Sequence, residues 1–268
     1  LTWTLTADGT LTISGTGAMK VYSTDDSPAY NNSNIKKVVI EDGVTSIGSF
    51  AFWSCTSLTS IEIPSSVTSI GQGAFFGCSS LTDITIPESV TSIGNSAFYE
   101  CTSLTSITIP GSVTSIGNCT FLNCSGLTSI TIPGGVTSIG YYAFSGTPWL
   151  TSKQNENPLV IVNGILIDGT ACSGEVTIPN DVTSIGDYAF RNCTGLKSIT
   201  IPKSVESVGD KAFSGCTALT EVLLEGGSTL TSESFGEVAD KVVTRWNEDN
   251  LTWTLTADGT LTISGTGA

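Results

Sequence analysis

The sequence contains no histidine and few positive charges, and each shortage excludes a class of function. Without histidine, neither a Ser–His nor a Cys–His catalytic pair can form, and a metal site would lack its commonest protein ligand. The formal charge of −14, from 10 Lys and Arg against 24 Asp and Glu, argues against nucleic acid or an anionic membrane as a partner. No apolar run approaches the roughly 18 residues of a membrane span.

Other catalytic arrangements are missing as well. The glycine-rich piece Gly15-Thr-Gly17 lacks the lysine and the following helix of a phosphate-binding loop. Carboxylates do not keep their place in the repeat described below. One such position is occupied in turn by Ser60, Asp83, Ser106, Ser129, Glu175, Ser198 and Glu221. This scatter is typical of a solvated face, so we predict a non-catalytic protein that needs no cofactor or metal.

What the sequence has in abundance is repetition with a period of 23 residues. The dipeptide Ile-Pro ends at Pro64, Pro87, Pro110, Pro133, Pro179 and Pro202. The dipeptide Ala-Phe ends at Phe52, Phe75, Phe98, Phe144, Phe190 and Phe213. A fixed period this short indicates a solenoid, in which each repeat can bury its apolar residues only against its neighbours.

One repeat illustrates the expected turn of the solenoid. Residues 58–63 have the L-x-x-I-x-I spacing of a short strand whose apolar side faces the core. Pro64 ends the strand because proline has no N–H for the next hydrogen bond. Gly71 is expected where a side chain would be crowded, and residues 74–78 are expected to fill the interior from a short helical or irregular turn.

Most of the eight cysteines also follow the repeat. Those that do are Cys55, Cys78, Cys101, Cys124, Cys193 and Cys216. Their position among core residues predicts unpaired thiols, because a buried cysteine behaves as a small apolar side chain. Pairing between neighbouring turns stays open, since the strand spacing of about 4.8 Å lies within the Cα separation of a disulfide.

The repeat divides the chain into segments. Residues 1–34 are expected to form a β-hairpin cap, with its turn at Asp8-Gly9, and a connector. The solenoid follows over residues 35–224. Its sixth turn is irregular over about 150–172, where Asn163-Gly164 between two β-branched runs predicts a second hairpin, projecting from the solenoid or lying along it. Residues 147–157, just before that hairpin, are expected to be a solvated loop.

The end of the sequence repeats its beginning. Residues 225–250 are expected to be a C-terminal cap or linker with a short helix over 232–243. Residues 251–268 then copy residues 1–18 letter for letter. Either the chain overruns into a second copy of a tandem module, or it was engineered. The copied hairpin could pair with an exposed sheet edge of its own or of a neighbouring chain, so self-association through 251–268 is one expectation.

The pattern Leu-x-x-Ile-x-Ile-Pro-x-x-Val-x-x-Ile-Gly-x-x-Ala-Phe-x-x-Cys resembles the BspA-like, Treponema-type leucine-rich repeat over residues 35 to about 224. The resemblance implies a right-handed, curved solenoid with a parallel sheet on one face and short helical or irregular turns on the other. It also implies a secreted or surface-attached bacterial protein, and members of the family are associated with adhesion. The departures are Thr120 in place of alanine and the irregular sixth turn.

The position after Ala-Phe is the best candidate for a binding surface. It holds large apolar residues in four successive turns, Trp53, Phe76, Tyr99 and Leu122. An exposed apolar stripe can mark a protein or glycan contact, although rings in this position could instead only pad the convex turn. A second aromatic cluster, which could simply cover the insert hairpin, is Tyr141, Tyr142 and Tyr188.

These observations lead to three functional hypotheses. The first is a non-catalytic, extracellular or cell-surface module for protein–protein or glycan interaction of the adhesion type. The alternative is a structural spacer in a tandem array, for which the copied residues are the evidence. An accessory domain of an enzyme would need its activity from a neighbouring region. The exposure of the four-residue stripe distinguishes the first two hypotheses.

Overall fold

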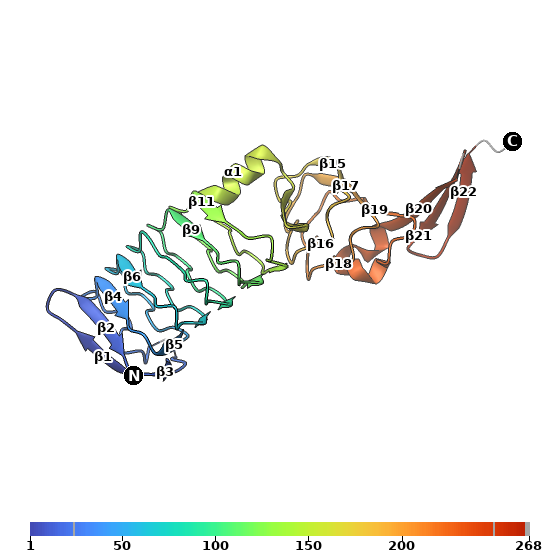
Figure 1. Ribbon diagram of the computed structural model, residues 1–268. Coiled ribbons are helices and arrows are strands. Elements are labelled where there is room, and N and C mark those ends of the chain that lie inside the picture. Colours follow the sequence, from blue (N-terminus) through green and yellow to red (C-terminus); the bar gives the residue numbers. More distant parts are fainter. Residues whose placement is uncertain (24, 249, 266–268) are drawn as a thin grey trace. The chain divides into compact units, whose positions relative to one another are not determined.

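The computed structural model describes residues 1–23, 25–248 and 250–265 (Figure 1). The chain divides into two compact units, Leu1–Ser152 and Lys153–Ala268. In each unit successive repeats form the turns of a parallel β-solenoid, so the predicted leucine-rich-repeat fold is confirmed.

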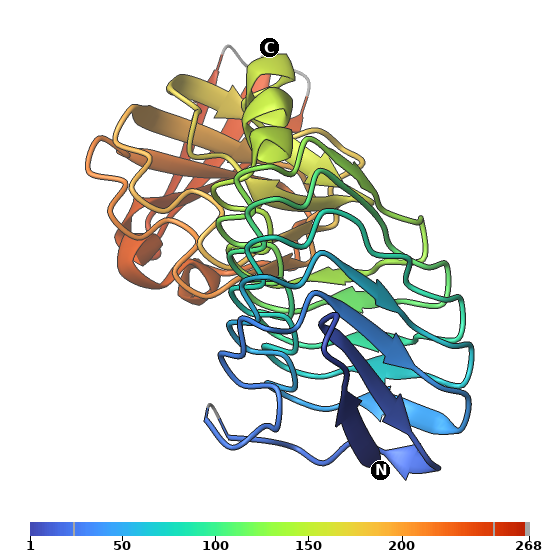
Figure 2. The ribbon, with the colours of Figure 1, turned by 90° about the vertical axis from the view of Figure 1, so that its left-hand side faces the viewer.

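Two lines of parallel strands run through the first unit. The first line follows the L-x-x-I-x-I segments and comprises β4 (Lys37–Ile40), β6 (Ser60–Glu62), β9 (Ser106–Thr108) and β11 (Ser129–Thr131). The second follows the Thr-Ser-Ile-Gly segments and comprises β3 (Gly17–Ala18), β5 (Val44–Ile47), β7 (Ser69–Ile70), β8 (Ser92–Ile93), β10 (Ser115–Ile116) and β12 (Ser138–Ile139). In Figure 2 the blue to green turns of this unit lie above one another in chain order.

A third line of hydrogen bonds passes through the Ala-Phe segments. The N–H of Phe75 donates to the carbonyl of Ala97 in the next turn at 2.8 Å, whereas the N–H of Cys78 donates back to the carbonyl of Phe75 at 3.1 Å. The same alternation recurs in neighbouring turns. These segments are therefore tight turns rather than helices, and each one is tied to the next turn through its backbone.

The core is built from identical side chains stacked along the solenoid. The rings of Phe52, Phe75 and Phe98 are fully buried and stacked, with centroids 5.4 and 5.3 Å apart. Gly71 confirms the expected crowding, because a Cβ there would lie 2.4 Å from the backbone nitrogen of Ser49. The turns can therefore approach closely only if this position carries no side chain.

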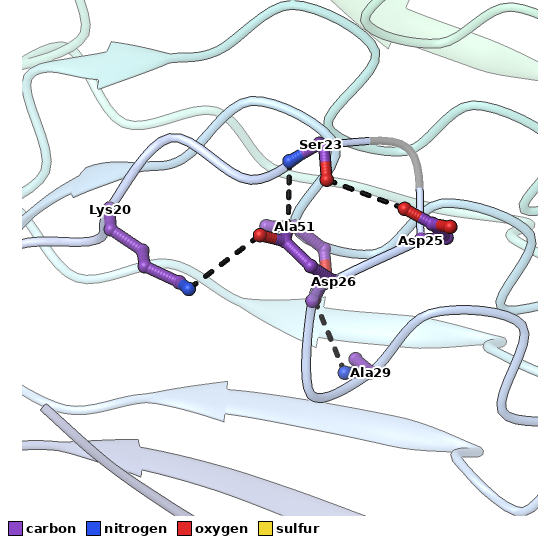
Figure 3. A network of polar contacts seen from close by, with 7 residues as sticks. Lys20, Ser23, Asp25, Asp26, Ala29 and Ala51 are labelled. Atoms are coloured by element: carbon purple, nitrogen blue, oxygen red, sulfur yellow. Dashed lines mark hydrogen bonds and ion pairs between the residues drawn. The ribbon is translucent and has the colours of Figure 1, made fainter.

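The N-terminal hairpin caps the first unit. Strands β1 (Thr2–Leu5) and β2 (Thr10–Ser14) are antiparallel, and β2 pairs in parallel with β4 of the first turn. The connector behind the hairpin is held by polar contacts (Figure 3): the Ser23 N–H donates to Asp26 at 2.7 Å, and Lys20 lies 3.8 Å from the same carboxylate. Buried Ser27 donates to the carbonyl of Ala51 in the first turn.

The expectation of a solvated loop over 147–157 was wrong. Helix α1 spans Pro148–Glu156, with Trp149 and Leu150 buried. Thr147 caps the helix, because its hydroxyl accepts the N–H of Leu150 at 3.1 Å. The Trp149 ring packs 4.8 Å from the ring of Phe144 and closes the phenylalanine stack of the first unit.

The second unit begins within α1, at Lys153, and its first strands form the predicted insert hairpin. Strands β13 (Val160–Val162) and β14 (Ile165–Asp168) are antiparallel, and Asn163 and Gly164 both have positive φ, as a two-residue hairpin turn requires. The hairpin does not project. Strand β14 pairs in parallel with β16 (Ser184–Ile185) and so takes the place of a repeat strand.

The remaining strands of the second unit form two sheets. Strand β16 is followed in its sheet by β18 (Ser207–Val208), and the other sheet begins with β15 (Gly174–Thr177), β17 (Leu196–Ile201) and β19 (Glu221–Glu225). The expected short helix is a 3₁₀ segment, η1 (Ser232–Lys241), interrupted at Gly236 and Val238.

The copied residues form a hairpin again. Strand β20 (Val242–Glu248) continues the sheet of β19, and β21 (Leu251–Thr256) and β22 (Leu261–Gly265) add to it as an antiparallel hairpin. The hairpin therefore pairs with an edge of its own chain, which is one of the two expectations. Residues 266–268 of the copied segment lie outside the described residues.

Candidate functional site

The four apolar residues predicted as a binding stripe lie in one line on the first unit. Trp53, Phe76, Tyr99 and Leu122 are all half-buried. The ring centroids of Trp53 and Phe76 are 4.6 Å apart, and those of Phe76 and Tyr99 are 4.4 Å apart. The three rings therefore form one continuous apolar surface that is partly open to solvent, and half-buried Leu122 occupies the same position in the next turn.

The local backbone explains why these side chains face outward. Ala74 and Phe75 point into the core, and the next residue, Phe76, lies on the outside of the turn. Gly77 then adopts a left-handed conformation, with φ of 69°, that returns the chain to the buried thiol of Cys78. Two positions that are not buried therefore lie between Phe75 and Cys78, and the first of them carries the stripe side chain.

Phe50 extends the stripe and was missed in the sequence. Its ring centroid lies 5.1 Å from that of Trp53, and its backbone is left-handed, with φ of 56°. The equivalent position in the next turn is Gly73, where a Cβ would lie 2.6 Å from the Phe50 ring. A phenylalanine aligned with a glycine 23 residues later was the only available signal.

The rings of the stripe cover one another's faces. Phe76 and Tyr99 are almost parallel, with 4° between their planes, and Trp53 is packed between Phe50 and Phe76. Solvent therefore meets mainly the ring edges. Such an arrangement suits apolar and edge-to-face contacts more than stacking of a planar or sugar ligand on an open ring face.

The second predicted cluster is divided between the two units. Tyr141 and Tyr142 form a T-shaped pair in the first unit, with centroids 5.5 Å apart and 89° between planes. In the second unit the guanidinium of Arg191 lies 5.3 Å from the ring centroid of Tyr188. All three tyrosines are half-buried. A single cluster of the three stays a prediction.

The cysteines form a line of thiols rather than a reactive site. All eight are free, and the six of the repeat are unpaired and buried, as predicted. The thiol of Cys78 donates to the carbonyl of Phe52 at 3.1 Å, and that of Cys124 to the carbonyl of Phe98 at 2.9 Å. Burial raises the pKa of the Cys124 thiol to about 12, so it stays protonated and unreactive near neutral pH.

The described residues offer neither a metal centre nor a membrane anchor. No group of three Cys, Asp or Glu side chains among them could hold a metal ion. None of the helices in the same residues is long and apolar enough to cross a membrane. The candidate site is therefore the partly exposed stripe, whose half-buried side chains lie in one line.

Comparison with solved structures identifies similar solenoids. A leucine-rich repeat protein from Eubacterium ventriosum is 28% identical, with a TM-score of 0.57, over 90% of this chain and 81% of that one. The T. pallidum leucine-rich repeat protein is 27% identical, with a TM-score of 0.46, over 81% of this chain and 87% of that one. A leucine-rich cell surface protein from Faecalibacterium prausnitzii is 26% identical, with a TM-score of 0.44, over 90% of this chain and 91% of that one.

No curated protein sequence matches the chain. Among protein families, the pattern described as "BspA type Leucine rich repeat region (6 copies)" matches residues 26–151 and 169–240. The unmatched residues between these ranges include the insert hairpin, and those outside them include both copies of the terminal hairpin. The match covers most of the turns described above, and the chain belongs to the BspA-type leucine-rich repeat family.

Proposed function

We propose that this chain is a non-catalytic, extracellular or cell-surface module that binds a protein partner through the stripe formed by Phe50, Trp53, Phe76, Tyr99 and Leu122. The observation that carries the proposal is the half-burial of these side chains in one line across successive turns. Aromatic residues that are partly exposed and already ordered can supply contact area at little further entropic cost.

A protein partner suits the stripe better than a glycan. A sugar ring usually needs an open aromatic face, whereas here the faces of Trp53 and Phe76 are covered by their neighbours. Apolar side chains of a protein can instead pack against the exposed ring edges and the Leu122 side chain. Adhesion to another protein is therefore the form of binding that we propose, and glycan binding is the competing outcome.

The stripe could also serve stability alone, as padding of the turns. Both roles predict that removing the rings costs some stability, because each ring is partly buried. They differ in binding. A stripe that only pads the turns has no partner to lose when its exposed edges become polar.

The test is an array of extracellular-matrix proteins and glycans probed with the chain and with a Trp53→Ser/Phe76→Ser/Tyr99→Ser variant. A Ser145→Ala/Ser214→Ala variant is the matched control, because these serines occupy the same repeat position in other turns. Circular dichroism verifies that each variant is folded. We expect the unchanged chain and the control variant to bind to protein spots on the array. The signal of the triple variant on the same spots should be at least tenfold lower.

Two results would contradict the proposal. Undiminished protein binding by the folded triple variant would place the interface elsewhere. Binding to glycans alone, lost in the triple variant, would keep the stripe but replace the protein partner with a sugar.

The spacer role remains the second candidate, and the repeated terminal hairpin favours it. That hairpin carries no residue of the stripe, so a role in joining modules and a role in binding are independent.

A further inference from the structure

The two copies of the terminal hairpin allow the same residues to be compared in two surroundings. In both copies the strands have the same register, with Trp3 opposite Ile13 and Trp253 opposite Ile263. The hairpin is therefore one structural unit, and differences between the copies report what lies next to it.

In the N-terminal copy the second strand is covered. Strand β2 pairs along its outer edge with β4, Leu11 opposite Val38 and Ile13 opposite Ile40. Leu11 is 4% exposed and Ile13 is 0% exposed. The first strand, β1, is instead the edge strand of its described sheet.

In the C-terminal copy the situation is reversed. The first strand, β21, pairs along its outer edge with β20, and the second strand, β22, is the edge of the described sheet. Leu261 is 53% exposed and Ile263 is 51% exposed. Two apolar residues that form core in one copy therefore face solvent in the other.

The surroundings of the hairpin turn also differ between the two copies. In the N-terminal copy a Cβ on Gly9 would lie 2.6 Å from the carbonyl oxygen of Asn34, and the Gly9 carbonyl accepts the N–H of Lys36 at 2.8 Å. In the C-terminal copy nothing among the described residues lies within 4 Å of a Cβ on Gly259. The connector and first turn of a solenoid are what occupy this place in the N-terminal copy.

We propose that the C-terminal hairpin is a connector between two copies of this module in series, and that residues 19–47 of a second copy cover β22. The second copy would add its β4 along the outer edge of β22. Its Val38 would then lie opposite Leu261 and its Ile40 opposite Ile263. Trp253 would meet the second copy's Tyr22 and Phe52, the neighbours of Trp3 here. One sheet then runs through the junction, from β19 and β20 through the hairpin to the next β4 and β6.

A second copy in series fits this surface better than a separate molecule of the same chain. In a separate molecule, β4 is already paired with that molecule's own hairpin, which has the same sequence. Exchange would break as many contacts with β4 as it made. A copy in series needs no such exchange, because the hairpin at 251–265 itself caps the first solenoid turn of the second copy.

The test is a chain of two copies, in which residue 268 is followed by a second copy of residues 19–250. Hydrogen exchange is measured on the amides of β22 that face away from β21. We expect them to exchange about a hundredfold more slowly in the two-copy chain than in residues 1–268 alone, because a new strand would protect them.

A charged pair gives an independent readout. Leu261→Asp/Ile263→Asp should leave the thermal midpoint of residues 1–268 unchanged, whereas the matched Leu11→Asp/Ile13→Asp variant should lower it. In the two-copy chain, Leu261→Asp/Ile263→Asp should lower the unfolding midpoint of the second copy by about 10 °C.

Three results would overturn the proposal. One is unprotected β22 amides in a folded two-copy chain. Another is a two-copy chain whose midpoints do not respond to the Leu261→Asp/Ile263→Asp change. The third, from analytical ultracentrifugation of residues 1–268, is a dimer that this change abolishes, since a separate molecule would then cover the hairpin.

Discussion

At the scale of single residues, the sequence indicates the buried positions better than it indicates the backbone. The apolar positions of the repeat are visible because burial selects the same side chains in turn after turn. Two further positions per turn, on either side of Ala-Phe-x, have left-handed backbone in almost every repeat. The first is occupied by Phe50, Gly73, Ser96, Cys119, Tyr142, Tyr188 and Lys211. These residue types share no sequence pattern, because side chains of different kinds can adopt the same positive φ angle.

This conformation can be tested at Gly77, which has φ of 69° and would place a Cβ 3.4 Å from the Ser54 hydroxyl. Because that space is adequate, Gly77→Ala should cost only the left-handed strain, about 1 kcal/mol of the free energy of unfolding. Urea unfolding followed by tryptophan fluorescence measures the change.

The reciprocal substitution is the control. Glu100 occupies the same position one turn later with φ of 57°, so Glu100→Gly should not destabilise the chain. A neutral Gly77→Ala together with a destabilising Glu100→Gly would show that these positions are not left-handed in solution.

At the scale of elements, the hairpins were predictable and the helix was not. Asp8-Gly9 and Asn163-Gly164 are local signals, since the turn itself requires those residues. Helix α1 is mostly polar, and its only buried residues, Trp149 and Leu150, are adjacent, so it has no helical periodicity. Its real signal was Thr147 before Pro148, a cap followed by a proline at the first helical position.

The cap makes a prediction for α1. Thr147→Ala removes the acceptor of the Leu150 N–H and should lower the free energy of unfolding by about 1 kcal/mol. Thr147→Ser keeps the hydroxyl and should retain most of that stability. Chemical unfolding followed by circular dichroism compares the two variants, and equal losses would mean that the hydroxyl does not cap the helix.

At the scale of the whole molecule, the 23-residue period was enough to predict a solenoid and the line of Trp53, Phe76 and Tyr99. It was not enough to predict how the rings of that line cover each other, since ring orientation depends on distances between turns. The period also could not show the division into two units after Ser152. That division falls within the segment where the repeat pattern is lost.

The buried thiols predict a loss of stability at alkaline pH. Burial raises the pKa of Cys55 and of Cys124 to about 12, from 9.0 for an exposed thiol. Well below pH 9.0 both thiols are protonated in the folded and the unfolded chain. Above it the unfolded chain releases these protons first, so the free energy of unfolding falls as the pH rises from 9 towards 12.

Urea midpoints at pH 7, 9 and 10.5 measure this effect. Each thiol should contribute up to about 1.4 kcal/mol per pH unit in the alkaline range. Cys55→Ala/Cys124→Ala should therefore show a shallower alkaline loss than the unchanged chain. Identical slopes would show that other groups, such as lysines and tyrosines, account for the whole effect.

The spacing of the contacts between turns has a consequence for the gene. The thiol of Cys78 reaches Phe52, and that of Cys101 reaches Phe75, at the same separation of 26 residues. The hydroxyls of Thr59, Thr82 and Thr128 each reach a carbonyl 23 residues earlier. Unequal recombination between repeats that removes or adds one whole turn would leave every such contact in register. The number of repeats in this protein can therefore change during evolution through single recombination events, none of which unfolds the solenoid.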